Sequence, residues 1–156
     1  MMKRLALALF ATLVPPALAA EVAYPDGYRD WHHVKSMVIQ PGHGLHEAFG
    51  GIHHLYANRK ALEGYRTGKF PDGAVIVFDL LEAPAEGGAI TEGRRKVVGV
   101  MARDAKRFAA TGGWGFEGFK GDSRTERAVG VNAAKVCFEC HAPLKDRSHV
   151  FSSLRK

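Results

Sequence analysis

The sequence predicts an α+β fold, a single domain in which an antiparallel β-sheet carries a few short helices. Three observations support this class: short runs of alternating apolar and polar residues, brief stretches with helical spacing, and turn residues between them. No change in composition divides the chain after residue 20. We therefore expect one domain over residues 21–156.

The first twenty residues have the pattern of a cleaved signal peptide. Lys3 and Arg4 precede an apolar run over residues 5–14, and Ala17-Leu18-Ala19 forms a cleavage site of the small-x-small type. The apolar run is short and is interrupted by Pro15-Pro16, which favours cleavage over a membrane anchor. We therefore expect an exported protein with no membrane span after the leader is removed.

Four segments have the alternation expected of strands: residues 37–39, 51–57, 74–81 and 96–102. In the third segment, alternation places apolar side chains on both faces, with Phe78 on one and Val77 on the other. A strand that is apolar on both faces is buried on both faces. We therefore expect the third strand to be covered on both sides for most of its length.

Three short helices are predicted between and after these strands. Asn58 can cap a helix that ends at Gly68, and Asp104 can cap a second helix over residues 105–110. Residues 132–141 have the spacing of a last helix, which Pro143 would end. This last helix carries the two cysteines of the chain.

The cysteines and a histidine form the run Cys137-Phe138-Glu139-Cys140-His141. C-x-x-C-H is the attachment pattern of c-type haem. The two thiols add to the two vinyl groups on one edge of the porphyrin, and the adjacent imidazole lies under the iron. We therefore expect one covalently bound haem c near the C-terminal helix, with His141 as the iron ligand.

Three other roles for the cysteines fit the sequence less well than haem attachment. A thioredoxin-like redox pair would lie at the start of a helix after an early strand, whereas this pair lies near the C-terminus. A zinc site would need a fourth ligand, for which His149 is available, but the chain has no second pair of cysteines. A disulfide between residues three apart would be strained. Haem attachment is the strongest of these interpretations.

The second axial position of the iron decides between an electron carrier and a haem that binds external ligands. A carrier usually fills this position with Met or His, and a gas-binding or catalytic haem leaves it open. No motif distinguishes any one candidate for a sixth ligand. The candidates are Met37, Met101, His32, His33, His43, His46, His53, His54 and His149.

The charge of the chain limits its partners. The 22 Lys and Arg residues exceed the 16 Asp and Glu residues and give a formal charge of +6, two units of which lie in the leader. No basic run with interleaved aromatic residues is present, so nucleic acid is not an expected partner. A mildly basic surface would favour an acidic redox partner.

Several further motifs, in the same order along the chain, resemble the cytochrome P-460 family and within it the cytochrome c′-beta branch. The resemblance extends over nearly all of the mature chain. It rests on Gly42-His43-Gly44-Leu45, Gly51-Ile52-His53-His54-Leu55-Tyr56-Ala57-Asn58, Gly68-Lys69-Phe70-Pro71-Asp72-Gly73-Ala74-Val75-Ile76-Val77, Gly112-Gly113-Trp114-Gly115-Phe116-Glu117 and the C-x-x-C-H run.

This resemblance implies a periplasmic homodimer with one haem c per subunit on an antiparallel sheet. In the c′-beta branch the iron is five-coordinate and high-spin, and phenylalanines line the distal pocket. By this resemblance, Phe49 and Phe78 look like the matching positions in this chain. Because an apolar pocket offers water and anions no hydrogen bonds, it favours small neutral ligands such as nitric oxide and carbon monoxide.

The enzymatic branch of the family implies a different function. Its members oxidise hydroxylamine and carry a lysine joined covalently to the haem, with a distal acid that moves protons. Lys60 and Lys69 are the possible counterparts of that lysine, and Glu63, Glu82 and Glu117 are the possible acids. Hydroxylamine oxidation is therefore the alternative to gas binding, and a low-spin electron carrier is the third interpretation.

Overall fold

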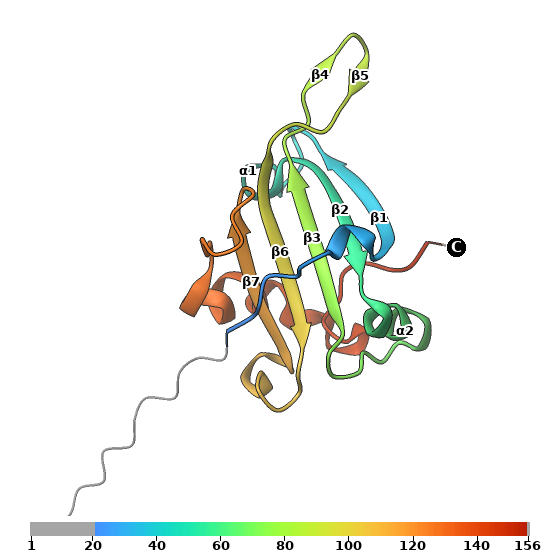
Figure 1. Cartoon of the computed structure of the whole chain (residues 1–156), viewed down its shortest axis with the longest axis vertical. Coiled ribbons are helices and arrows are strands. Elements are labelled where there is room, and N and C mark those ends of the chain that lie inside the picture. The colour runs from blue at the N-terminus through green and yellow to red at the C-terminus, as the bar shows by residue number, and fades with distance from the viewer. Residues whose placement is uncertain (1–20, 156) are drawn as a thin grey trace, which may run out of the picture.

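The computed structural model describes residues 21–155, so the predicted leader over residues 1–20 lies outside the described residues. The centre of the fold is a five-stranded antiparallel sheet with the order β1-β2-β3-β6-β7. A small hairpin is inserted between β3 and β6 (Figure 1). The predicted α+β class with an antiparallel sheet is confirmed. The strands are β1 (His32–Ile39), β2 (Gly51–Ala57), β3 (Val75–Leu81), β6 (Arg95–Arg103) and β7 (Trp114–Lys120), with β4 (Ala85–Glu86) and β5 (Ala89–Ile90) in the hairpin.

The helices are short, and most are single turns. They are η1 (Tyr28–Asp30), α1 (His46–Phe49), α2 (Arg59–Thr67), η2 (Ala109–Thr111), η3 (Gly130–Asn132), the π-helical turn η4 (Ala134–Phe138), α3 (Glu139–His141) and η5 (Ala142–Arg147). Within residues 21–155, no helix has both the length and the hydropathy needed to cross a membrane.

The capping residues predicted for α2 have the expected geometry. The side chain of Asn58 accepts a hydrogen bond of 2.8 Å from the backbone N–H of Ala61, which satisfies one of the free donors of the first turn. Gly68 ends the helix with φ of +77°, a conformation that favours glycine. The sequence therefore predicts both ends of this helix correctly.

Three predicted elements differ from the structure, and the structure has one further strand in the large sheet, β7. The helix expected over residues 105–110 is a turn followed by η2, and Asp104 caps that turn through bonds to the N–H groups of Lys106 and Arg107. Gly112 is left-handed with φ of +63°, and the N–H of Gly113 bonds to the oxygen of Phe108 at 2.8 Å, so the chain turns toward β7 instead of continuing a helix. β1 begins five residues earlier than predicted, and β7 was not predicted. The last helix is divided into η3, η4 and α3, and helical turns continue past Pro143 through η5.

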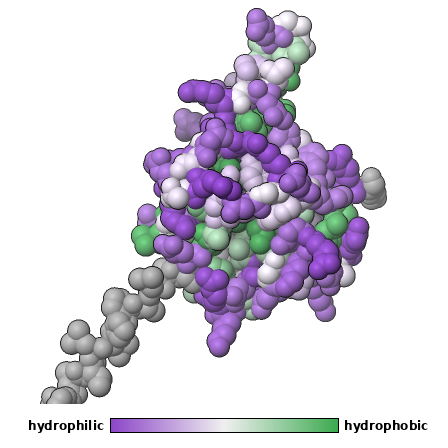
Figure 2. Space-filling model, in the orientation of Figure 1, coloured by the Kyte–Doolittle hydropathy of each residue, from purple (hydrophilic) through white to green (hydrophobic). Residues whose placement is uncertain are grey.

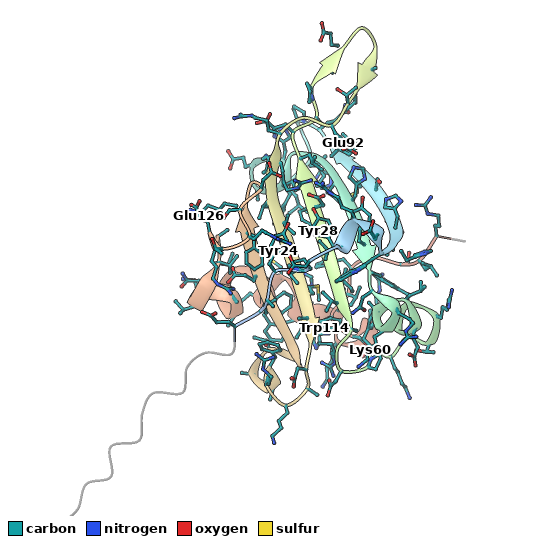
Figure 3. All side chains as sticks on the ribbon, viewed as in Figure 1. Tyr24, Tyr28, Lys60, Glu92, Trp114 and Glu126 are labelled. Atoms are coloured by element: carbon teal, nitrogen blue, oxygen red, sulfur yellow. The ribbon has the colours of Figure 1, made fainter. Side chains whose placement is uncertain are left out.

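Both faces of the sheet are covered, as the pattern of β3 predicts. On the front face the N-terminal segment crosses the strands, and Tyr24 and Tyr28 lie there (Figures 1 and 3). Tyr28 packs with the buried Val77, Val98 and Phe119. Hydrophilic side chains predominate on the outer surface of this side (Figure 2).

On the opposite face, α2 and the C-terminal segment pack against the sheet (Figure 1). The buried core there joins Ala61 of α2, Ile76 of β3, Trp114 of β7 and Val150 of the C-terminal segment. Cys137 packs at the edge of this core. The C-x-x-C-H run therefore lies on the face of the sheet opposite the N-terminal segment.

Candidate functional site

The helical turns η4 and α3 place the three side chains of the C-x-x-C-H run along one wall of a cavity. Cys137, Cys140 and His141 are spaced i, i+3 and i+4, which puts them on the same face of a helical segment. All three line a cavity of about 360 Å³ between this segment and the sheet. Local helical geometry thus brings the two thiols and the imidazole of the C-x-x-C-H run to the same wall of the cavity.

The remaining walls of the cavity are mainly apolar and come from the strands of the large sheet, from α1 and its loop, and from the C-terminal segment. Five lining side chains are polar or charged besides His141: His53, Glu117, Cys137, Cys140 and Ser152. The others are Met37, Ile39, Leu45, Phe49, Leu55, Ile76, Phe78, Gly99, Val100, Met101, Phe116, Val150 and Phe151.

The ring of His141 is held in one tautomer. Its Nδ1 lies 2.7 Å from the backbone oxygen of His149 and must donate, because a carbonyl oxygen only accepts. The lone pair of the neutral ring is therefore on Nε2, the form in which histidine binds metals. Burial lowers the pKa of His141, which favours this neutral form. Phe116 and Phe151 pack against the ring with centroid distances of 5.0 and 4.8 Å.

The thiol of Cys137 lacks the properties of a redox-active cysteine. Burial raises the pKa of Cys137 to about 11, whereas a thioredoxin-like pair depends on a lowered pKa. Cys137 and Cys140 do not form a disulfide with each other. Among the described residues, no three His, Cys, Asp or Glu side chains are grouped to hold a metal ion, so the zinc set with His149 does not form there.

Phe49 and Phe78 lie together in the same cavity as the C-x-x-C-H side chains. Their rings are 5.7 Å apart and nearly perpendicular, the edge-to-face arrangement that aromatic pairs favour. Phe49 comes from α1, just ahead of β2, and 41% of its surface is exposed. The structure thus brings the two predicted phenylalanines and the attachment motif to one site.

His53 packs beside these two phenylalanines. In the sequence it is one of nine candidates for the sixth ligand of the iron, and no motif distinguishes it from the others. Its ring packs on Phe78 with a centroid distance of 4.5 Å, and only 5% of the residue is exposed. Its Nδ1 is buried without a hydrogen-bond partner among the described residues. Burial lowers the pKa of His53 to about 4, and the neighbouring His54 adds to this effect, so the ring is neutral at pH 7.

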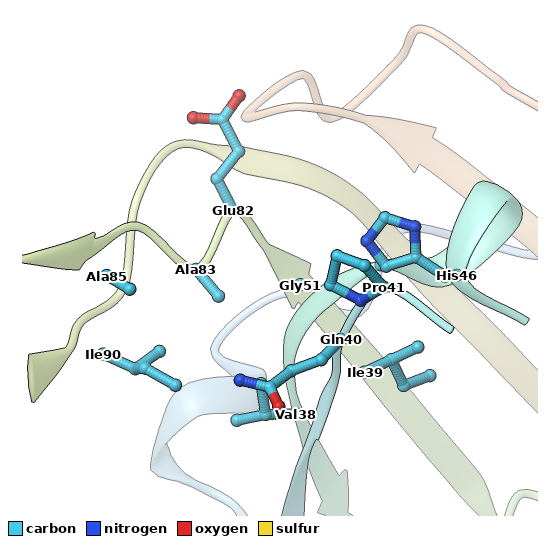
Figure 4. A pocket seen from close by; sticks show the side chains of 11 residues that line it. Val38, Ile39, Gln40, Pro41, His46, Gly51, Glu82, Ala83, Ala85 and Ile90 are labelled. Carbon is cyan, nitrogen blue, oxygen red and sulfur yellow. The ribbon is translucent and has the colours of Figure 1, made fainter. Parts of the chain in front are cut away.

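Of the other eight candidates for a sixth ligand, only Met37 and Met101 line the cavity. His149 instead donates through Nδ1 to the backbone oxygen of His141 at 3.2 Å. His46 lies in a second hollow of about 310 Å³ at the base of the β4–β5 hairpin (Figure 4). The remaining histidines do not line the cavity; they are His32, His33, His43 and His54.

The lysines proposed for a haem cross-link lie outside the cavity. Lys60 is on α2, and its Nζ donates to the backbone oxygen of Asp72 at 2.7 Å (Figure 3). Lys69 is exposed and lines a different depression. Within the part of the chain that the structure describes, no lysine lines the cavity.

Of the three acids proposed for proton transfer, two lie outside the cavity and the third is already hydrogen-bonded to other groups. Glu63 is exposed on α2, and Glu82 lies in the second hollow and pairs with Arg94 (Figure 4). Glu117 does line the cavity, but its carboxylate accepts bonds from Arg127 and from three backbone N–H groups. Burial alone would raise the pKa of Glu117, yet these bonds hold it below its ordinary value.

The donor set fits a c-type haem. Two thiols and a neutral, oriented imidazole share one helical face at the wall of an apolar cavity, and this fold and site define the class of c-type haem proteins. The family model for cytochrome P460 matches residues 25–152. The chain belongs to the cytochrome P460 family, whose members are typically exported. No curated protein is significantly similar to the sequence.

Proposed function

We propose that this protein is a periplasmic mono-haem protein that binds nitric oxide and carbon monoxide. Cys137 and Cys140 attach the haem through thioether bonds, and His141 ligates the iron. Phe49 and Phe78 would line the side of the cavity at which an external ligand binds. The observation that carries the proposal is that one cavity contains all five of these side chains.

The chain's own residues account for the selectivity for small ligands. When bound, haem c would supply an iron atom that can bind a neutral diatomic molecule. The carbonyl oxygen of His149 fixes the orientation of His141 and makes its ring a better electron donor. Phe49 and Phe78 present an apolar surface to the cavity, so they would restrict the size of a bound ligand and offer water no hydrogen bonds.

Optical spectra of the purified ferric and ferrous protein, with and without carbon monoxide and nitric oxide, test the proposal. A five-coordinate high-spin haem that changes its spectrum with both gases is expected. A low-spin spectrum that does not respond to gas would instead make the protein an electron carrier with Met37, Met101 or His53 as the sixth ligand.

Peptide mapping distinguishes the enzymatic alternative. Haem is expected only on the tryptic peptide that contains Cys137 and Cys140, because no lysine of the described chain lines the cavity. Haem on a peptide with Lys60, Lys69 or another lysine would favour hydroxylamine oxidation. Light scattering on the same sample measures the oligomeric state, for which we expect a homodimer.

A further inference from the structure

Three polar side chains are buried in the described structure, and two of them have complete sets of partners. Asp79 accepts from the hydroxyl of Tyr28 at 2.7 Å and from the guanidinium of Arg95 at 2.6 Å. Glu117 accepts from Arg127 and from backbone N–H groups. The third is His53, whose buried Nδ1 has no partner among the described residues. A buried polar atom without a partner calls for a physical explanation.

The same contrast holds among the polar side chains that line the cavity. Cys137, Cys140 and His141 belong to the attachment motif, and Glu117 is engaged as described. The hydroxyl of Ser152 is 2.7 Å from the hydroxyl of Tyr65. After these are assigned, His53 is the polar side chain of the described cavity wall that remains available to a ligand.

The position of His53 places it beside the two phenylalanines. Its ring packs on Phe78, which in turn contacts Phe49. The next residue, His54, lies on the opposite face of β2, where its Nδ1 is 2.6 Å from the hydroxyl of Ser36 and its Nε2 is 2.7 Å from Glu92. Two adjacent histidines therefore have different surroundings, and only the first faces the cavity.

We propose that His53 is a ligand-binding residue of the haem cavity that hydrogen-bonds to the small polar ligand bound at the iron. This inference rests on the proposed function, because it assigns His53 to the side of the cavity that Phe49 and Phe78 cap. A neutral imidazole offers one N–H donor and one acceptor. His53 can therefore donate to the outer atom of nitric oxide or accept from a ligand that carries a proton, such as water or hydroxylamine.

The assignment makes the pocket selective in a way that two phenylalanines alone would not. Apolar walls discriminate by size, whereas a single hydrogen-bonding group in an apolar cavity discriminates strongly between ligands that can pair with it and those that cannot. The low pKa of His53 supports this role, since the ring keeps both its donor and its acceptor at pH 7. His53 is thus a specificity-determining residue rather than a packing residue.

The infrared stretching frequency of carbon monoxide bound to the ferrous holoprotein tests this inference. A hydrogen bond to the oxygen draws electron density into the antibonding orbital of the ligand and lowers the frequency. We expect His53→Leu to raise the frequency relative to wild type and His53→Gln, which retains a donor, to give a value nearer to wild type. His54→Leu is the matched control and should leave the frequency unchanged.

The outcomes separate this inference from the proposed function. Carbon monoxide binding with the same frequency in wild type and His53→Leu would overturn the role of His53 and leave gas binding intact. Failure of wild type to bind carbon monoxide would overturn both. A low-spin wild-type haem that becomes five-coordinate in His53→Leu would make His53 an iron ligand, which also contradicts hydrogen bonding to an external ligand.

Discussion

Replacing Phe49 with alanine should open the cavity without unfolding the protein. Truncating a fully buried Phe costs about 3–5 kcal/mol of unfolding free energy. Because 41% of Phe49 is exposed, we expect a loss of about 2 kcal/mol, which includes its edge-to-face contact with Phe78. If the ring must move when a ligand binds, its removal relieves about 1–3 kcal/mol of crowding, which is roughly tenfold to hundredfold in association rate.

Flash photolysis of the carbon monoxide complex measures this rate directly, and stopped-flow mixing gives the corresponding rate for nitric oxide. Phe108→Ala is a suitable control, because Phe108 is a partly buried aromatic residue on the opposite face of the sheet. It should lower stability without changing either rate. Association rates for Phe49→Ala within about twofold of wild type, with unchanged iron coordination, would refute the capping role and leave Phe49 as a packing residue.

Three further changes test other parts of the structure. Replacing Cys137 or Cys140 with alanine should greatly reduce the haem that remains on the chain in denaturing gels; retention of wild-type staining would contradict thioether attachment. Asp79→Ala removes the buried carboxylate that accepts from both Tyr28 and Arg95 and leaves Arg95 paired with the exposed Asp122, so it should cost about 3 kcal/mol in denaturant unfolding, unlike an exposed control such as Glu126→Ala. His53 is neutral in the folded chain down to a pKa of about 4, whereas the unfolded side chain takes up a proton near pH 6.5. His53 should therefore account for about 3 kcal/mol of the stability that wild type loses between pH 6.5 and 4. His53→Leu should remove this loss, and parallel pH profiles for the two proteins would show that His53 is not its source.

The sequence predicts the centre of the sheet because β2, β3 and β6 have clear alternation. It does not predict β7, because this strand contains Gly115 and Gly118, residues typical of turns. The structure explains these glycines: a Cβ on Gly115 would lie 2.4 Å from the ring of Phe108. Packing from another segment requires glycine there, and a local pattern carries no information about that segment.

The candidate site was predictable to different degrees. The C-x-x-C-H run is contiguous, so its residues meet through local helical geometry alone. Phe78 lies on β3 and Phe49 on α1, outside the paired strands, so their contact depends on how α1 folds over the sheet; the family resemblance rather than periodicity indicates them. His53 had a partial signal: alternation places it on the same face of β2 as Leu55. The sequence could not show which face of β2 borders the cavity or that Nδ1 would have no partner.

The orientation of His141 depends on distant parts of the fold. Ser148 and His149 both adopt left-handed conformations, with φ of +54° and +62°, which cost non-glycine residues roughly 1–2 kcal/mol each. Two contacts hold this bend: the buried Trp114 donates from Nε1 to the oxygen of Ser148 at 2.8 Å, and the hydroxyl of Ser148 donates to the oxygen of Gly68 at 3.0 Å. The bend directs the next carbonyl, that of His149, onto Nδ1 of His141. The end of α2 and the start of β7 therefore fix the tautomer of a histidine in the C-terminal segment, and unusual backbone at such a position is typical of a functional site.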